Sequence, residues 1–272
     1  MKFSICSEVF KKPIEETLRL AGEIGFDGVE VAPFDVANSV EEVSPERRVA
    51  IREAAVDAGV RISGLHWLLV TPKGLHVTTP DDEVRRRSFD YLQALVHFCA
   101  DIGGEFLILG SPQQRNLVEG DTLPAALERV VPHLRELGDV CASREVHFLL
   151  ETLDPPQTDF LNRFEDTMAL LESIDHPRVN YMLDTRAMSA MPDGVLGNIR
   201  KYGARTSYYH ANQPDGRGPG MGDFDFAPVF EALTEVGYEG WISTEPFDYQ
   251  PDGKTVARTA LAALKQSLTG DQ

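Results

Sequence analysis

The sequence has few cysteines and no long apolar run. Three cysteines, Cys6, Cys99 and Cys141, are scattered through 272 residues without a paired spacing. An odd number of unpaired positions favours reduced thiols over a disulfide framework. No apolar stretch reaches the roughly 18 residues that a membrane-spanning helix needs, and the opening MKFSICSEVF lacks the basic and apolar regions of a secretion signal. We therefore expect a cytoplasmic protein that does not enter a membrane.

Basic residues are scarce as well. Lys and Arg together number 26 against 43 Asp and Glu, which gives a formal net charge of −17. A surface this acidic repels phosphate backbones and anionic lipid. We therefore expect neither nucleic acid nor membrane as a partner. A small phosphorylated substrate stays compatible, because it needs only a local basic pocket.

What the sequence does contain is an eightfold alternation of short apolar runs and longer amphipathic stretches. The strand-like runs are 2–7, 28–32, 61–65, 105–110, 147–151, 179–184, 206–210 and 240–245. The helix-like stretches are 13–25, 45–58, 83–102, 121–143, 163–173, 195–202, 227–236 and 254–268. Eight strand–helix units without a reversal predict a parallel sheet that closes into a (β/α)8 TIM barrel, an α/β fold. Since no linker or low-complexity segment interrupts the pattern, residues 1–272 are predicted to form a single domain.

Four residues that can bind a metal stand at the ends of four successive strand-like runs. Glu151, Asp184, His210 and Glu245 close the runs HFLLE, VNYMLD, TSYYH and GWISTE. A barrel gathers the carboxyl ends of its strands around one mouth, so these groups can converge. Three carboxylates and an imidazole suit Mn²⁺, Mg²⁺ or Co²⁺, and the lack of thiolate argues against structural zinc. A single acidic residue at such a position is more often a helix cap or an ion pair, so the metal interpretation depends on the whole set.

Around these residues the sequence resembles the xylose isomerase-like barrel superfamily. The resemblance is carried by LLET (149–152), MLDT (182–185), YHAN (209–212), GPGMGDFDF (218–226), STEPF (243–247) and GFDGVEV (25–31). Members include ketose 3-epimerases, hydroxypyruvate isomerase, inosose isomerases and dehydratases, and endonuclease IV.

The resemblance implies a metal-dependent isomerase or epimerase of a sugar or keto-polyol, with Mn²⁺ as the first candidate ion. It implies that Glu151 and Glu245 bind the metal and also serve as the acid/base pair, while Asp184 and His210 are ligands only. It also implies a homo-oligomer, either a dimer or a tetramer.

The sequence departs from the ketose 3-epimerase pattern at positions that handle the substrate. Gln157 stands where that family has a second Glu, and Ala187 stands where it has a His. Arg217 lies seven residues after His210, one further than the loop Arg of that family. The metal chemistry is therefore expected to carry over, whereas specificity for a free ketose is not. Gln157 and Arg217 remain candidate substrate-binding residues, since an Arg fork binds sugar oxygens or a phosphate well.

Three further candidates for substrate contact follow predicted strands. His66 and Trp67 come after the third strand and suit hydrogen bonding and stacking on a sugar face, although Trp67 could equally cover the barrel top. Phe247 follows the eighth strand and is predicted to line the pocket. Glu30 is a charged residue inside the strand GVEVA, and a buried ion pair is the interpretation that we favour for it.

Other functions remain open. A lyase of the inosose dehydratase type would use the same enolate to expel a hydroxyl, and the sequence does not separate it from an isomerase. DNA hydrolysis of the endonuclease IV type needs three metals and additional His ligands, which Ala187, Asp223 and Asp225 do not supply. A sugar-binding barrel without turnover would not require both candidate catalytic glutamates. The identity of the sugar, its phosphorylation state and the native metal are left undecided at this point.

Overall fold

The eight predicted strands all form, and their order around a closed parallel barrel runs from β1 to β8. The computed structural model describes residues 1–270. The strands are β1 (Lys2–Cys6), β2 (Gly28–Val31), β3 (Arg61–Leu65), β4 (Phe106–Leu109), β5 (His147–Glu151), β6 (Val179–Asp184), β7 (Tyr208–Ala211) and β8 (Trp241–Thr244). The prediction of a (β/α)8 barrel is confirmed.

Each predicted helix is found within a few residues of its expected bounds. These helices are α1 (Ile14–Ile24), α2 (Pro45–Asp57), α3 (Asp82–Asp101), α4 (Leu123–Ser143), α5 (Phe164–Ile174), α7 (Gly194–Tyr202), α8 (Ala227–Glu235) and α9 (Gly253–Thr269). Short polar side chains begin several of them. Asp81 accepts hydrogen bonds from the first backbone amides of α3, Thr122 does so for α4, and Asp252 for α9.

Shorter elements lie between these helices, and the sequence did not predict them. A five-residue helix, α6 (Thr185–Ser189), starts directly after Asp184, whose side chain accepts from the amide of Ala187. The 3-10 helices are η1 (Ser7–Phe10), η2 (Pro33–Asp35), η3 (Val40–Glu42), η4 (Pro112–Gln114) and η5 (Gly203–Arg205). Several of these short helices follow strands at their carboxyl ends, where helical periodicity is too brief to detect.

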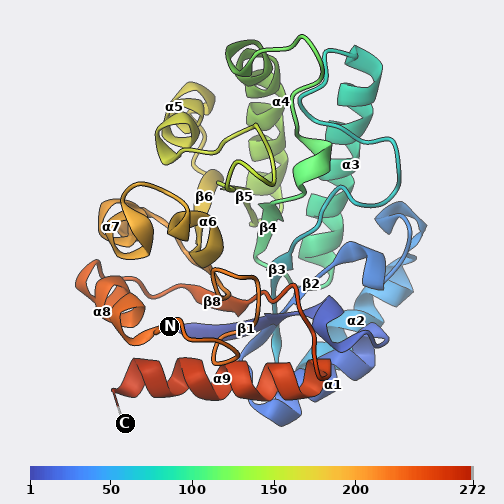
Figure 1. The fold of residues 1–272 in the computed structure, drawn as a ribbon. Helices are drawn as coiled ribbons and strands as arrows, with labels where there is room; N and C mark the ends of the chain where they lie inside the picture. The colour runs from blue at the N-terminus through green and yellow to red at the C-terminus, as the bar shows by residue number, and fades with distance from the viewer. Residues whose placement is uncertain (271–272) are drawn as a thin grey trace. The chain divides into compact units, whose positions relative to one another are not determined.

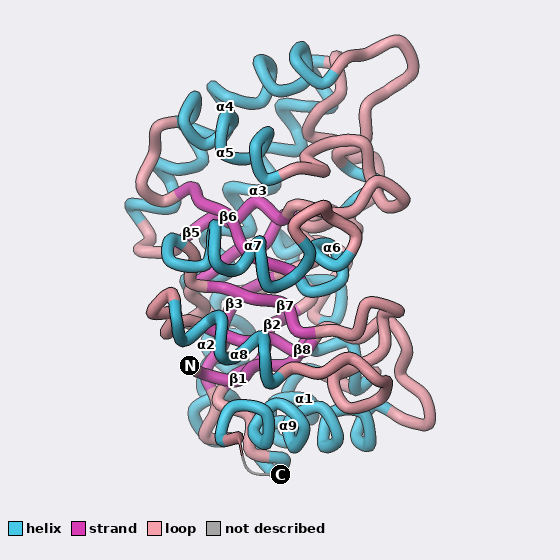
Figure 2. Tube along the Cα trace, turned by 60° about the vertical axis from the view of Figure 1, so that its left-hand side comes forward, coloured by secondary structure: helices cyan, strands magenta, loops and turns pink. Residues whose placement is uncertain are grey.

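The chain divides by internal contacts into two compact units. One comprises Met1–Val31, Glu53–Ser63 and Met182–Gln272, and the other comprises Ala32–Arg52 and Gly64–Tyr181. In the first, α9 packs against α1, α8 and β8 (Figure 1). In the second, α4 contacts both α3 and α5 (Figure 2). That residues 1–272 form one domain remains a prediction.

The amino end of β8 carries a large buried indole in the first unit. Trp241 is 1% exposed, and the ammonium of Lys2 lies 4.2 Å from its ring centroid. On β2, Gly28 leaves the space that this ring occupies. A Cβ atom at position 28 would lie 2.7 Å from Cζ3 of Trp241 and 3.1 Å from the carbonyl oxygen of Arg61. The close approach therefore requires glycine at this position.

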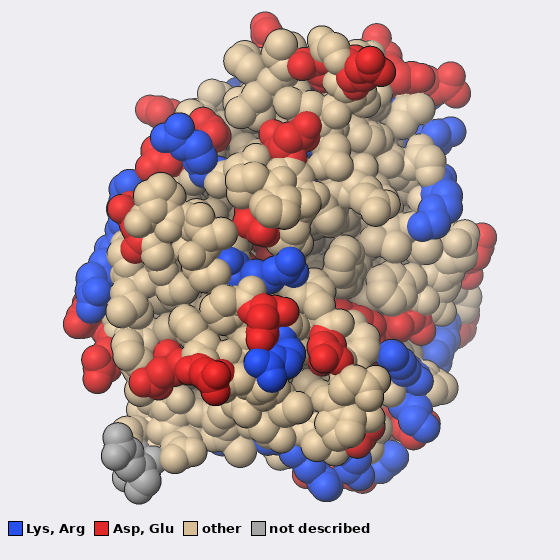
Figure 3. All heavy atoms as spheres, in the orientation of Figure 1, with Lys and Arg blue, Asp and Glu red and all other residues tan. Residues whose placement is uncertain are grey.

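Charged side chains of both signs are spread over the surface. On the face drawn in Figure 3, acidic and basic side chains are interspersed with uncharged surface. Within residues 1–270, no helix combines the length and the apolar character that crossing a membrane requires.

Gly28→Ala is expected to lower the free energy of unfolding by about 1–3 kcal/mol, because the added methyl overpacks the Trp241 ring. Chemical denaturation of Gly28→Ala, Trp241→Phe and the double variant measures the coupling. The smaller ring relieves the clash, so Gly28→Ala should cost less in the Trp241→Phe background. Strictly additive costs would show that the indole does not limit the space at position 28.

Candidate metal centre

The carboxyl ends of β6, β7 and β8 bring three of the four predicted ligands together. Asp184 is the last residue of β6, His210 lies one residue before the end of β7, and Glu245 directly follows β8. One potential ligand atom from each of these three residues lies within 4.8 Å of the others, and Glu151 is the last residue of β5 in the second unit. All four residues are buried. Asp184, His210 and Glu245 therefore lie together at their strand ends, although β7 extends one residue past His210 and β8 stops one residue before Glu245. That these three and Glu151 bind one metal ion stays a prediction.

The imidazole of His210 lies between two buried carboxylates. Its Nε2 is 3.1 Å from each carboxylate oxygen of Glu30, and its Nδ1 is 3.1 Å from Oε2 of Glu245. Glu30 and His210 are fully buried. In the tautomer whose Nε2–H donates a hydrogen bond to the Glu30 carboxylate, the lone pair of Nδ1 faces the other potential ligands. Glu30 is thus a member of a buried pair, as predicted, and its partner is a candidate metal ligand.

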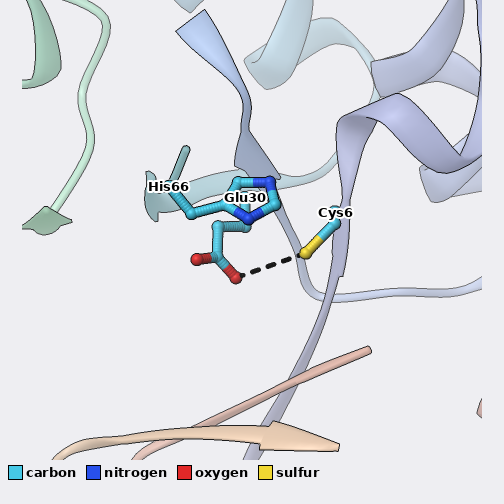
Figure 4. Close-up of side chains that lie close together, drawn as sticks. All are labelled: Cys6, Glu30 and His66. Atoms are coloured by element: carbon cyan, nitrogen blue, oxygen red, sulfur yellow. Dashed lines mark hydrogen bonds between the residues drawn. The ribbon is translucent and has the colours of Figure 1, made fainter. Parts of the chain in front are cut away.

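A neutral thiol lies beside this pair. Cys6 Sγ donates to Oε2 of Glu30 over 3.7 Å (Figure 4). Burial, reinforced by the negative charge of Glu30, raises the pKa of the Cys6 thiol well above its ordinary value. Cys6 and Glu30 are themselves potential ligands. We assign no ion to this pair, because the thiol stays protonated and the carboxylate is bound to His210.

Asn212 links two of the carboxylates, and the sequence analysis did not single it out. Its amide nitrogen donates to Oδ2 of Asp184 over 2.8 Å and to Oε2 of Glu245 over 3.4 Å. Its amide oxygen accepts from the backbone N–H of Arg186 over 3.0 Å. The residue is fully buried two positions after His210, within the segment YHAN. A polar residue two positions after a candidate ligand was the feature of the sequence that could have identified Asn212.

Glu151 is supported within the second unit by two residues that the sequence analysis also missed. The guanidinium of Arg115, fully buried, donates through Nη1 to the backbone oxygens of Glu151 over 2.7 Å and of Leu109 over 3.1 Å. Burial lowers the pKa of Arg115 to about 10, while the charge of Glu151 opposes the shift. The arginine therefore stays charged at neutral pH, and it holds the ends of β4 and β5 in place.

Gly110 provides the space for the carboxylate of Glu151. A Cβ atom at position 110 would lie 1.9 Å from Oε2 of Glu151, so any larger residue would displace that oxygen. The donor set of three carboxylates and one imidazole, together with this glycine cradle, fits a hard divalent cation. Glu151, Asp184, His210 and Glu245 could hold it.

The predicted substrate-binding residues of the second unit lie in loops after β3 and β5. His66 is buried and Trp67 is half-buried, with their ring centroids 6.2 Å apart. Trp67 has a φ of 51°, an uncommon backbone conformation for a bulky residue. Gln157 turns back within its loop, and its side-chain amide donates to Asp154. Contact of these three residues with a substrate stays a prediction.

The two candidates of the first unit differ in what their side chains contact. Nη2 of Arg217 lies 2.7 Å from Oδ2 of Asp215, and this hydrogen-bonded ion pair raises the pKa of the guanidinium. Phe247 is 38% exposed, and the guanidinium of Arg186 lies 5.1 Å from its ring centroid. Substrate contact by Arg217 and Phe247 also stays a prediction. The sequence analysis did not consider Arg186 as a functional residue.

Comparisons with known proteins agree on one family of barrels. The family described as xylose isomerase-like TIM barrel matches residues 18–267. A Synechocystis protein named as a probable ketose 3-epimerase is 24% identical over 287 residues, covering 98% of this chain and 96% of the relative. The D-psicose 3-epimerase of Ruminiclostridium cellulolyticum is 32% identical over 120 residues, 44% of this chain and 41% of the relative. A crystal structure of D-psicose 3-epimerase with D-tagatose from Clostridium cellulolyticum superposes with a TM-score of 0.86 at 20% identity, covering 98% of this chain and 99% of that one, which establishes a shared fold.

Glu30→Ala is expected to weaken Mn²⁺ binding by about 10- to 100-fold, because the imidazole of His210 loses the acceptor that orients it. Glu30→Gln keeps one acceptor oxygen and should lose less. Isothermal titration of the metal-free protein measures both dissociation constants. The matched control is Cys6→Ala, which removes a neighbour of the same carboxylate and is expected to stay within about threefold of the parent. Equal affinities for Glu30→Ala and the parent would contradict the orienting role.

Proposed function

The chain belongs to the xylose isomerase-like TIM barrel family, and we propose that it uses one divalent metal ion to isomerise or epimerise a sugar or keto-polyol by proton transfer. Its relatives are named epimerases, so the chain is an enzyme of the isomerase class. The observation that carries the metal-dependent proposal is the convergence of Asp184, His210 and Glu245 at buried strand ends. Glu151, buried at the end of β5, is the fourth ligand that we propose.

The reaction requires that a weakly acidic proton leave a carbon next to a carbonyl. At neutral pH this proton departs only if the negative charge of the resulting enediolate is stabilised. A divalent ion, with Mn²⁺ first and Mg²⁺ or Co²⁺ as alternatives, supplies that stabilisation as a Lewis acid when it is bound. The protein must then provide a base that removes the proton and an acid that returns one.

Glu151 and Glu245 are the groups that we assign to proton transfer. They stand at the carboxyl ends of different strands, β5 and β8. Asn212 donates to Glu245, while the glycine at position 110 provides the space that the Glu151 carboxylate fills. One glutamate removes the proton, and the other returns it to the opposite face or to the neighbouring carbon.

Asp184 and His210 are assigned to binding alone. Both oxygens of Asp184 accept hydrogen bonds, Oδ1 from the amide of Ala187 over 2.6 Å and Oδ2 from Asn212 over 2.8 Å. His210 is fixed by Glu30. Such fully restrained groups suit a ligand that must keep one position through a catalytic cycle. The homo-oligomer and the cytoplasmic location inferred from the sequence remain predictions.

Proton exchange tests the chemistry directly. In D₂O, the Mn²⁺-loaded protein is incubated with ketoses, keto-inositols and hydroxypyruvate, and the products are followed by NMR. Deuterium should enter at the carbon next to the carbonyl, and Glu151→Gln and Glu245→Gln should each lower turnover by at least about 100-fold. A product that differs only in configuration or carbonyl position indicates an isomerase, whereas loss of a hydroxyl indicates the dehydratase alternative.

The matched control is Glu231→Gln, which neutralises an exposed carboxylate on α8. It should exchange deuterium at the rate of the parent. Exchange that survives chelation, or that survives both active-site substitutions, would refute the assignment of the metal and the two glutamates.

Metal removal has a second expected result that does not depend on turnover. A ligand that binds only the folded state stabilises it by about 2.7 kcal/mol at a concentration 100 times its Kd. Adding Mn²⁺ to the chelated protein should therefore raise the thermal midpoint, and Asp184→Asn should reduce the rise. Differential scanning fluorimetry across a Mn²⁺ titration measures the effect. An identical shift in Asp184→Asn would place the ion elsewhere.

A further inference from the structure

Arg186 is positioned by the same asparagine that holds two candidate metal ligands. Its backbone N–H donates to the amide oxygen of Asn212 over 3.0 Å. The amide nitrogen of Asn212 donates in turn to Asp184 over 2.8 Å. Arg186 also follows Asp184 by two residues, so it belongs to the carboxyl-end side of β6. Its main chain is therefore tied to the metal centre by one buried side chain.

The guanidinium of Arg186 lies over an aromatic ring. Its Cζ is 5.1 Å from the ring centroid of Phe247. The backbone N–H of Phe247 donates to the oxygen of Gly216 over 2.7 Å. A Cβ atom at position 216 would lie 3.3 Å from the ring and 3.9 Å from Nη1 of Arg186, at a φ of 87° that favours glycine. Contact with the ring limits the motion of the guanidinium without using its N–H groups.

Those N–H groups meet no acceptor within the described residues. Among residues 1–270, the guanidinium of Arg186 makes no hydrogen bond or ion pair, although acidic residues outnumber basic ones by 43 to 26. Two other arginines of the same unit are paired, Arg217 with Asp215 at 2.7 Å and Arg200 with Glu235 at 2.8 Å. Arg186 is half-buried, and its guanidinium is therefore available to a ligand.

We propose that Arg186, supported on the ring of Phe247, binds an anionic group of the substrate, so that the substrate is a keto sugar carrying a carboxylate or a phosphate. This inference rests on the proposed function, and it names the substrate class of that site. A planar guanidinium donates two parallel hydrogen bonds to a carboxylate or a phosphate, whereas a neutral hydroxyl offers a weaker single contact. Arg217 is the arginine that the sequence indicated for this role, but its guanidinium is bound to Asp215.

Three ketoses that differ at carbon 6 test the inference. Fructose, fructose 6-phosphate and fructuronate carry a hydroxymethyl, a phosphate and a carboxylate there, and each is titrated into the Mn²⁺-loaded protein by calorimetry. At least one anionic probe should bind about 10- to 100-fold more tightly than fructose. The tighter of the two identifies the anionic group as phosphate or carboxylate.

Variants at position 186 assign the effect to the guanidinium. Arg186→Met should weaken binding of the anionic probe far more than binding of fructose, so that the preference for the anionic probe is lost. Arg186→Lys keeps the charge and loses the planar fork, so it should restore part of the preference. The matched control is Arg258→Met, which removes an exposed arginine of α9 and should leave every affinity unchanged.

Two results would overturn the inference. One is that neither anionic probe binds more tightly than fructose. The other is that Arg186→Met weakens all three probes equally or leaves the anionic preference intact. These results are distinct from a failure of the proposed function. A protein that exchanges protons on fructose without charge preference refutes only the role of Arg186, whereas one that binds anionic probes through Arg186 without any exchange refutes only the proton transfer.

Discussion

The buried imidazole of His210 is the interaction on which the rest of the candidate site depends. Its two nitrogens lie 3.1 Å from the carboxylates of Glu30 and Glu245, and neither Glu30 nor His210 reaches solvent. Burying charged groups costs several kcal/mol unless they are paired and hydrogen-bonded. The hydrogen bonds among the three residues offset that cost, because the fold places Glu30 on β2, His210 on β7 and Glu245 immediately after β8. The ring orientation that results leaves Nδ1 on the side of the other potential ligands.

Several buried groups support the candidate ligands without being candidate ligands themselves. Asn212 holds two carboxylates through one amide nitrogen. Arg115 fixes the carboxyl ends of β4 and β5 through backbone oxygens, and Gly110 leaves the volume that a carboxylate fills. These residues restrict the ligand side chains to one arrangement. Such preorganisation is what allows a site to stabilise developing charge without rearranging during the reaction.

The candidate metal ligands match the family pattern, whereas several candidate substrate-binding positions depart from it. Gln157 and Ala187 replace the Glu and His expected of ketose 3-epimerases, and Gln157 donates to Asp154 within its own loop. Arg217 is bound to Asp215, while the nearby Arg186 is supported on Phe247 without an acidic partner. A family of barrels can keep its metal chemistry on the strand ends and change specificity through loop residues of this kind.

The sequence by itself determined the barrel and the four candidate ligands, because both follow from periodicity. Eight alternating runs specify eight strands, and a residue at a strand end has a known place in a barrel. It indicated that Glu30 needed a partner, but only the tertiary structure decided that the partner is His210, 180 positions away. Arg115, Gly110 and Arg186 escaped detection, since their roles come from neighbours brought close by folding. Which arginine is paired and which lacks an acceptor depends on distances between side chains, and no local pattern in the chain encodes those distances.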